Sequence, residues 1–356
     1  MNTPSTALSC LNPRCKSQAM LDTNKSLIRH SRLQTKGGFR QRWRCKLCGS
    51  TLTARNGTPY HRLRNPASRF DVVLKMVMEG SSKASIARVQ EISVSTVQRW
   101  IERAAKHASA FTDRLVRELD PVEIQADELR GCGPSRQDRH YVFATIEVSS
   151  RLWVSQQVGG RTMRNCRLVM QETRRRCAIT GPRTLIVTDP FRYYREAIRT
   201  SWGTTCVHVE SKKCLRKRRV VAVKNELVLG NEWHLEQARA RSEDSKVLNT
   251  AYIERLNLFA RRALACLHRR TTSLVRSSRN LKTLIDLLQC YYNFARPHGS
   301  LKFGGKKRTP AMQAGLVTRT LSLRQIFMST GPLARVPWIV DPKGREGWRT
   351  ACGNNS

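Results

Sequence analysis

Short apolar runs typical of strands alternate with stretches of helical periodicity across residues 120–295, and this pattern constrains the fold most. Residues 122–127 alternate apolar and polar side chains, as in a strand covered on one face. Two β-rich runs, 141–148 and 152–158, are separated by three polar residues and predict an antiparallel hairpin. Residues 185–187 are all apolar, as expected of a central strand buried on both faces.

The segments that follow extend this alternation. Helical periodicity covers residues 163–177 and 191–201, and residues 205–209 predict a last strand. The resulting order, β-β-β-α-β-α-β followed by helices, is that of a ribonuclease-H-like fold. We therefore expect an α/β domain of this type over residues 119–320. Residues 321–356 are expected to form a partly disordered C-terminal tail, because Gly and Pro recur there.

The charge balance points to a polyanionic partner. Lys and Arg number 65 and Asp and Glu 26, which gives a net charge of +39. Nucleic acid is the expected partner, with an anionic membrane surface a distant second. No apolar run is long enough to span a membrane, and the N-terminus lacks the basic and apolar regions of a secretory signal. The expected location is therefore the cytoplasm, in association with the nucleoid.

Four of the twelve cysteines form two close pairs, Cys10 with Cys15 and Cys45 with Cys48. In a reducing compartment such pairs bind metal more often than they form disulfides. Four thiolates suit one tetrahedral zinc ion, and residues 1–65 are too polar to build a sizeable core without one. The sequence therefore predicts a zinc-ribbon-like DNA-binding module.

The first pair is spaced more widely than usual, which leaves two alternatives to this ligand set. His30 or His61 could replace one cysteine, although both lie outside knuckle spacing. The four thiols could also be unliganded.

Residues 66–118 predict three short helices, the third beginning after Ser93 as N-cap. The exposed face at the start of the third helix would carry polar side chains, as in the recognition helix of a helix-turn-helix module. These residues, expected to contact DNA, are Ser95, Thr96, Gln98 and Arg99. The alternative is a plain three-helix connector, since Gln90 or Glu91 occupies the turn position where Gly is common.

Three carboxylates are candidates for catalysis. Asp127 and Asp189 are expected at the ends of the first and fourth strands, and Glu254 on a helix that also carries Asn257 and Arg261 on the same face. Three such acids can hold two divalent ions for phosphodiester cleavage, Mg²⁺ or Mn²⁺. Each acid taken alone could instead be a salt-bridging or capping residue.

Several segments resemble one family of enzymes. They are residues 42–58, 124–129, 186–189, 249–257 and 292–301, the last two being the most specific. On these segments, which lie within residues 8–320, the chain resembles the DDE transposases of bacterial insertion sequences, in particular the insertion-element-one-like group with a zinc ribbon and a helix-turn-helix. The resemblance implies that Asp127, Asp189 and Glu254 are the metal-binding acids.

The chain departs from the family pattern in the long interval between the second and third acids. This interval holds a basic block, residues 212–219, which we interpret as a solvated loop that contacts phosphate through Lys217, Arg218 and Arg219. It also holds other acids that could supply the third ligand, namely Glu232, Glu236 and Glu243. Pro190 stands where these enzymes more often have Gly.

The expected function is therefore that of a transposase acting as a homodimer or higher oligomer on double-stranded DNA. It would bind terminal inverted repeats, cleave the element's ends and transfer the freed 3′-OH to target DNA, with Arg255 and Arg261 as further DNA contacts. The alternatives are a DNA-binding regulator with an inactive ribonuclease-H-like domain, and a simple endonuclease.

Overall fold

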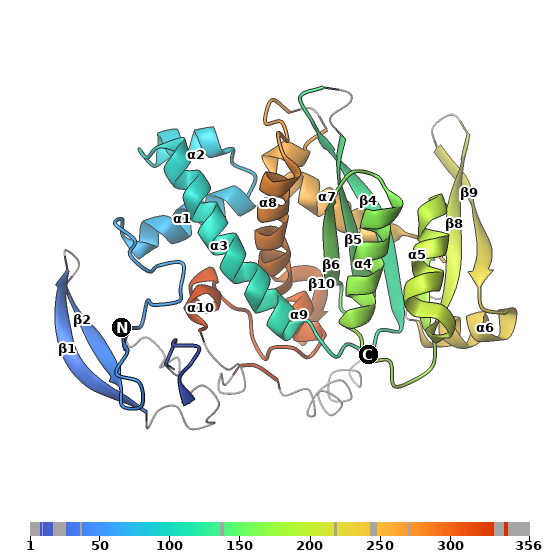
Figure 1. Cartoon of the computed structure of the whole chain (residues 1–356). Helices are drawn as coiled ribbons and strands as arrows, with labels where there is room; N and C mark the ends of the chain where they lie inside the picture. Colours follow the sequence, from blue (N-terminus) through green and yellow to red (C-terminus); the bar gives the residue numbers. More distant parts are fainter. Residues whose placement is uncertain are drawn as a thin grey trace.

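The computed structural model describes residues 8, 10–16, 26–35, 38–135, 139–216, 219–242, 248–269, 271–330 and 338–340. It is a mixed α/β structure with a small N-terminal sheet, a group of helices and a large mixed sheet (Figure 1).

The strands are β1 (Leu27–Thr35), β2 (Gly38–Cys45), β3 (Thr51–Thr53), β4 (Glu123–Cys132), β5 (Arg139–Glu147), β6 (Leu152–Gly159), β7 (Thr184–Thr188), β8 (Cys206–Arg216), β9 (Arg219–Leu229), β10 (His298–Phe303) and β11 (Lys306–Arg308). The α-helices are α1 (Ala67–Met78), α2 (Lys83–Val89), α3 (Val94–Leu115), α4 (Met163–Arg175), α5 (Arg192–Trp202), α6 (Glu232–Arg241), α7 (Ala251–Ala263), α8 (Ser278–Cys290), α9 (Pro310–Gln313) and α10 (Leu323–Met328). Short 3₁₀ turns lie at Gly203–Thr205 and Ala265–Leu267, and a π-turn at Tyr291–Ala295.

The N-terminal sheet is a three-stranded antiparallel unit in the order β1-β2-β3. Its buried apolar cluster is small and consists of three cysteines with Leu27 and Leu52. Gly49 adopts a φ of +71° in the turn after β2, where a Cβ would be strained. Among the described residues, Leu8, Trp43 and Cys48 are partly buried against this cluster.

The three predicted helices after residue 66 are present as α1, α2 and α3. Ser93 caps α3 through its side chain, as predicted, and Glu91 adopts a φ of +47° at the turn position where Gly is common. The prediction that the third helix is short is wrong, because α3 has 22 residues. Apolar residues continue at helical spacing to Leu115, so the helix extends alongside α8 (Figure 1).

The large sheet has the order β6-β5-β4-β7-β8-β9, with β4 near its centre. β4, β5 and β6 are antiparallel neighbours, which confirms the predicted hairpin, whereas β7 and β8 run parallel to β4. β7 is buried along its whole length, as predicted for a central strand.

Two predictions about the far side of this sheet are wrong. The strand predicted at 205–209 continues as β8 to Arg216, and it is not the last, because β9 pairs with it antiparallel. The basic block interpreted as a solvated loop therefore lies mostly in this β8–β9 hairpin. Lys212 pairs with Lys224 and Cys214 with Ala222, so the backbone groups that the two strands turn toward each other are paired. Lys217 and Arg218 lie outside the described residues.

Helices cover both faces of the sheet. α4 packs on β5 and β6, and α5 on β8. On the opposite face α6 packs on β7 and β8, and α7 on β4 and β5. Side chains alternate accordingly along β7, where Leu185 and Val187 cluster with Leu235 of α6 while Ile186 joins the main core.

The segment predicted as a tail begins with an ordered helix. α10 places Phe327 against Tyr60 and Phe70, with ring centroids 6.2 and 6.1 Å apart. Trp338 is also buried, whereas residues 331–337 and 341–356 lie outside the described residues. None of the helices in the described part of the chain combines the length and apolar character that a membrane crossing requires.

Candidate functional site

The two predicted aspartates lie on neighbouring parallel strands. Asp189 directly follows β7, as predicted. The prediction that Asp127 ends its strand is wrong, because β4 remains paired with β5 through Cys132 and Arg139. Ala126 pairs with Thr188, so the next residue of each chain segment is an aspartate. Strand pairing therefore brings the backbones of the two acids side by side.

Alternation along β4 decides which face Asp127 occupies. Gln125, two residues earlier, contacts α7, whereas Glu128 forms an ion pair with Arg161 near the start of α4. Successive side chains of a strand point to opposite faces. Asp127 consequently faces α7, and its Oδ2 accepts a 2.7 Å hydrogen bond from Nδ2 of Asn257.

The start of α7 is held on the sheet by a strand residue. Oε1 of Gln125 accepts hydrogen bonds from the backbone N–H groups of Tyr252 (3.0 Å) and Ile253 (3.1 Å). These are donors that a helix leaves unsatisfied at its N-terminus, and Thr250 makes no side-chain cap. Because Gln125 is fully buried, this contact fixes the helix that carries Glu254 above β4.

Glu254 is the third predicted acid, and it is engaged by a cation of the same chain. Nζ of Lys213, on β8, forms an ion pair with its Oε1, and the Thr250 hydroxyl donates to the same oxygen at 2.8 Å. The three carboxylates thus share one face of the sheet. They do not form a closed ligand set, since among the described residues only the cysteine cluster is compact enough to hold a metal as it stands.

The electrostatics of these acids are those of a crowded acidic site. Burial, followed by the charge of Asp189, raises the pKa of Asp127 to about 7. Burial and the charge of Glu254 also raise the pKa of Asp189, whereas Lys213 and Thr250 oppose the shift. Buried neighbouring carboxylates disfavour each other's ionisation, and an added cation would relieve that cost.

We expect the stability of the protein to depend on pH through Asp127. Its folded pKa lies above the ordinary value of about 3.9, so the folded state binds the extra proton and wild type loses stability as pH rises from about 4 to 7. Asp127→Asn cannot ionise and escapes this loss. Without added Mg²⁺, the melting temperature of the variant minus that of wild type should grow between about pH 5 and 7 and level off above 8. A constant difference would contradict the raised pKa.

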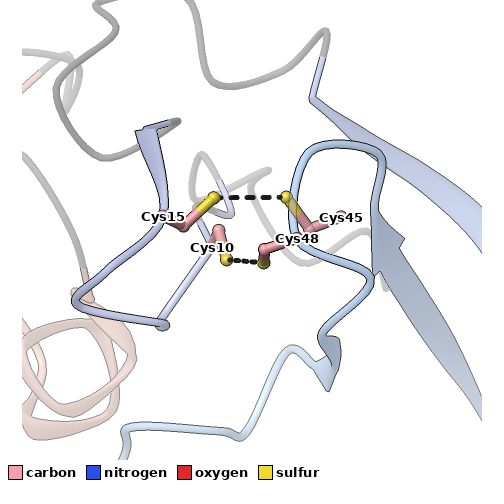
Figure 2. A group of neighbouring side chains, drawn as sticks. All are labelled: Cys10, Cys15, Cys45 and Cys48. Carbon is pink, nitrogen blue, oxygen red and sulfur yellow. Dashed lines mark hydrogen bonds between the residues drawn. The ribbon is translucent and has the colours of Figure 1, made fainter.

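The predicted cysteine site is assembled (Figure 2). The Sγ atoms of Cys10 and Cys48 are 3.5 Å apart, those of Cys15 and Cys45 are 3.7 Å apart, and all four lie within 4.8 Å of one another. Zn–S bonds of about 2.3 Å in a tetrahedron require sulfur separations of about 3.8 Å. The cluster could therefore hold one structural zinc ion and is compatible with a zinc ribbon.

The backbone around the second pair is shaped for this arrangement. Cys45 N–H donates to the carbonyl of Ser50 at 2.9 Å, and Gly49 N–H donates to that of Cys45 at 2.9 Å. Hydrogen bonding by Ser50 lowers the pKa of Cys48 to about 6, whereas burial raises that of Cys10 to about 12. His30 is outside the cluster and bonds Ser31, so the histidine alternative has no support.

The predicted DNA-reading residues lie together on the first turns of α3. The Ser95 and Thr96 hydroxyls contact that of Ser93, and Arg99 is exposed with a hydrogen bond to Thr96 at 3.3 Å. Gln98 is held on both sides, accepting from Lys83 at 2.9 Å and donating to Glu102 at 2.8 Å. Gln98 would have to exchange these partners to contact a base.

The remaining predicted DNA contacts are dispersed. Arg261 does not extend freely on the Glu254 face, because its Nη1 donates to the carbonyl of Leu267 at 3.3 Å. Arg255 lies on another side of α7, over the ring of Tyr252. Arg219 begins β9.

Sequence reasoning did not identify Gln125, Thr250 and Lys213 as parts of this site. The alternation of residues 122–127 already placed Gln125 on the face of Asp127, and a buried glutamine there was a usable signal. Lys213 gave no signal, because it lies among many cations and only the β8 pairing brings it to Glu254.

Comparison with known proteins does not identify the chain. No protein-family model matches it, and no curated protein matches it significantly. Its function must be inferred from the residues and their geometry.

Proposed function

We propose that the chain is a DNA transposase that binds the ends of an insertion sequence and catalyses metal-dependent strand cleavage and strand transfer. The observation that carries the proposal is the presence of Asp127, Asp189 and Glu254 on one face of a sheet, in a chain of net charge +39. A basic protein that keeps three buried or half-buried acids together is suited to a negatively charged substrate bridged by divalent ions.

The topology supports a ribonuclease-H-like assignment for this domain. Three antiparallel strands are followed by two parallel ones in the sheet order β6-β5-β4-β7-β8. The first of these strands in the chain, β4, therefore lies between β5 and the parallel strand β7. The additional strand β9 and helix α6 occupy the long interval before Glu254 and form the insertion in the family pattern. Of the other acids in that interval, Glu232 and Glu236 lie on α6 and Glu243 lies outside the described residues, whereas the charge of Glu254 acts on both aspartates.

The chain's own residues would have to change partners before catalysis. Asp127 would release Asn257, and Glu254 would release Lys213, to free oxygen atoms for two Mg²⁺ or Mn²⁺ ions. When bound, such ions activate the attacking oxygen and stabilise the leaving oxygen of a phosphodiester. Lys213 would remain close enough to the site to contact a DNA phosphate, because it comes from the adjacent strand β8.

The proposed partners follow from the same charges. Double-stranded DNA would be bound by the zinc ribbon, the helices α1–α3 and the β8–β9 hairpin, with the protein acting as a homodimer or higher oligomer. The proposed location is the cytoplasm in association with the nucleoid.

Two other functions use the same residues. A simple endonuclease would cleave without strand transfer, and a DNA-binding regulator would not cleave at all. The test is incubation with Mg²⁺ and DNA that carries the ends of the source element. Nicks at the element junctions followed by joined products support a transposase, nicks alone support an endonuclease, and binding without nicks supports a regulator.

We expect base discrimination and bulk affinity to reside in different modules. Replacing Gln98 and Arg99 by Ala should lower the ratio of specific to non-specific affinity, since each good base contact contributes about 1–3 kcal/mol. Replacing Lys217, Arg218 and Arg219 by Ala should instead weaken binding to all sequences and flatten the salt dependence. Salt titrations on terminal-repeat and scrambled duplexes measure both effects. If the Gln98/Arg99 variant keeps its full preference for the terminal repeat, the start of α3 does not read the bases, and the zinc module would be the part that does.

A further inference from the structure

A pocket of about 190 Å³ lies on a different side of α7 from Glu254. Residues 252, 255 and 259 share this side of the helix by their spacing of three and four, whereas 254 and 257 share the side that faces Asp127. The turn between β5 and β6 contributes Arg151, and the segment after α8 contributes Tyr292, Arg296 and His298. Segments far apart in sequence therefore build one recess beside the acidic site.

Three arginines and three aromatic rings line this pocket. The guanidinium of Arg151 lies 3.6 Å from the ring centroid of Tyr252, and that of Arg296 lies 4.8 Å from the ring centroid of Phe259. Arg255 forms no ion pair with any described residue, and Arg296 has only a 3.9 Å contact with Glu79. The recess thus combines excess positive charge with aromatic rings, of which Tyr252 and Phe259 each lie against a guanidinium of the chain.

The recess continues into a second hollow of about 380 Å³ that shares Arg255, Phe259 and Arg296 with it. This hollow adds one cation, Arg262, and one acid, Glu79. A chain of phosphates could follow these arginines past the pocket. His298 lines the first pocket. Its Nε2 is buried and has no hydrogen-bond partner among the described residues, and its ring centroid lies 4.4 Å from that of Tyr292. Burial lowers the pKa of His298 to about 4, so the ring is neutral near pH 7.

We propose that this pocket receives one unpaired nucleotide of a DNA strand, with its base stacked on Phe259 and its phosphates held by Arg255 and Arg296. Aromatic rings accept any base by stacking, and arginines bind the backbone phosphates beside it. The pocket is of the size of a single base. A phosphorylated peptide would use the arginines but not the flat aromatic surfaces, so a nucleotide is the better fit.

The inference rests on the proposed function only in taking DNA as the substrate. Glu254 and Arg255 are consecutive on α7, so a strand cleaved at the acids would have its next nucleotides near the pocket. Unstacking one nucleotide there costs free energy, which the arginine and aromatic contacts would offset.

The test uses a single-stranded twelve-residue probe of abasic sites with one central 2-aminopurine, compared with the fully abasic strand. No Mg²⁺ is added, so the result is independent of cleavage. We expect wild type to bind the base-containing probe about tenfold more tightly and to quench its fluorescence by stacking. Phe259→Leu should remove most of this preference, and Arg296→Gln should weaken both probes. Arg164→Gln, an exposed arginine on α4, is the charge-matched control and should behave as wild type.

Several outcomes would overturn the inference. If wild type leaves the 2-aminopurine fluorescence unquenched, the inference is wrong. This result does not depend on whether any variant folds. Equal affinity for the two probes, or full base preference in Phe259→Leu with native circular dichroism, would overturn it as well. Failure of strand cleavage with Mg²⁺ would contradict the proposed function and leave this binding result standing.

Discussion

Asp127→Asn is expected to lower the rate of Mg²⁺-dependent strand cleavage by a factor on the order of a thousand or more. Its affinity for DNA should remain that of wild type. An amide is a poor ligand for a divalent ion, and the other acid of β4 on that face, Glu123, is engaged by Gln125 and Ser242. Removal of a negative charge near the phosphates does not weaken electrostatic binding. Nicking of end-containing DNA and a gel-shift titration measure the two quantities on the same preparations.

The neighbouring acid on the same strand provides a matched control. Glu128 points to the opposite face and pairs with Arg161, so Glu128→Gln changes the charge by the same amount without reaching α7. We expect this control to cleave within a few-fold of wild type. Cleavage by Asp127→Asn at a rate near that of the control would show that the acidic site is not catalytic.

Cys45→Ser is expected to reduce bound zinc from one ion per chain to near zero and to unfold the module formed by β1, β2 and β3. Cys45 is fully buried, and among the described residues the buried apolar side chains beside the cysteines are Leu27 and Leu52, with Leu8 and Trp43 packed against them. The apparent free energy of binding zinc to such sites is about 10–16 kcal/mol and is coupled to folding. Elemental analysis and hydrogen exchange of the strand amides measure the two losses.

Cys214→Ser is the control, because Cys214 lies on β8, away from the cluster. It should keep one zinc ion and normal protection of β1–β3. Purified wild type without zinc, or unchanged zinc in Cys45→Ser, would refute the metal site. Loss of zinc with unchanged protection would show that the sheet folds without the ion.

Local patterns in the sequence predicted the elements that depend on nearby residues. The hairpin of β5 and β6, the buried strand β7 and the N-cap at Ser93 follow from period-two alternation, apolar runs and capping chemistry. The four cysteines were also identified correctly, because thiolate ligands need only short knuckle spacing and a nearby turn.

Features that depend on pairing between distant segments were predicted less well. The basic block was interpreted as a loop, because a run of charged residues is not typical of a strand. Its residues form part of β8 because they pair with β9. The third helix was predicted to be short, but α3 continues to Leu115 because its apolar face packs against α8. The predicted tail contains α10, which is ordered by contact with Tyr60 and Phe70 rather than by its own six residues.

Residue types and their spacing were sufficient to identify the residues of the candidate chemistry: the four cysteines, Asp127, Asp189 and Glu254. Their partners became evident only from the folded chain. Gln125 anchors the helix of Glu254, Lys213 occupies its carboxylate, and the arginine-lined pocket forms from three separate segments. The physical reason is that residue type and local period are properties of the chain, whereas ion pairs, burial and pockets arise when strands and helices far apart in sequence pack together.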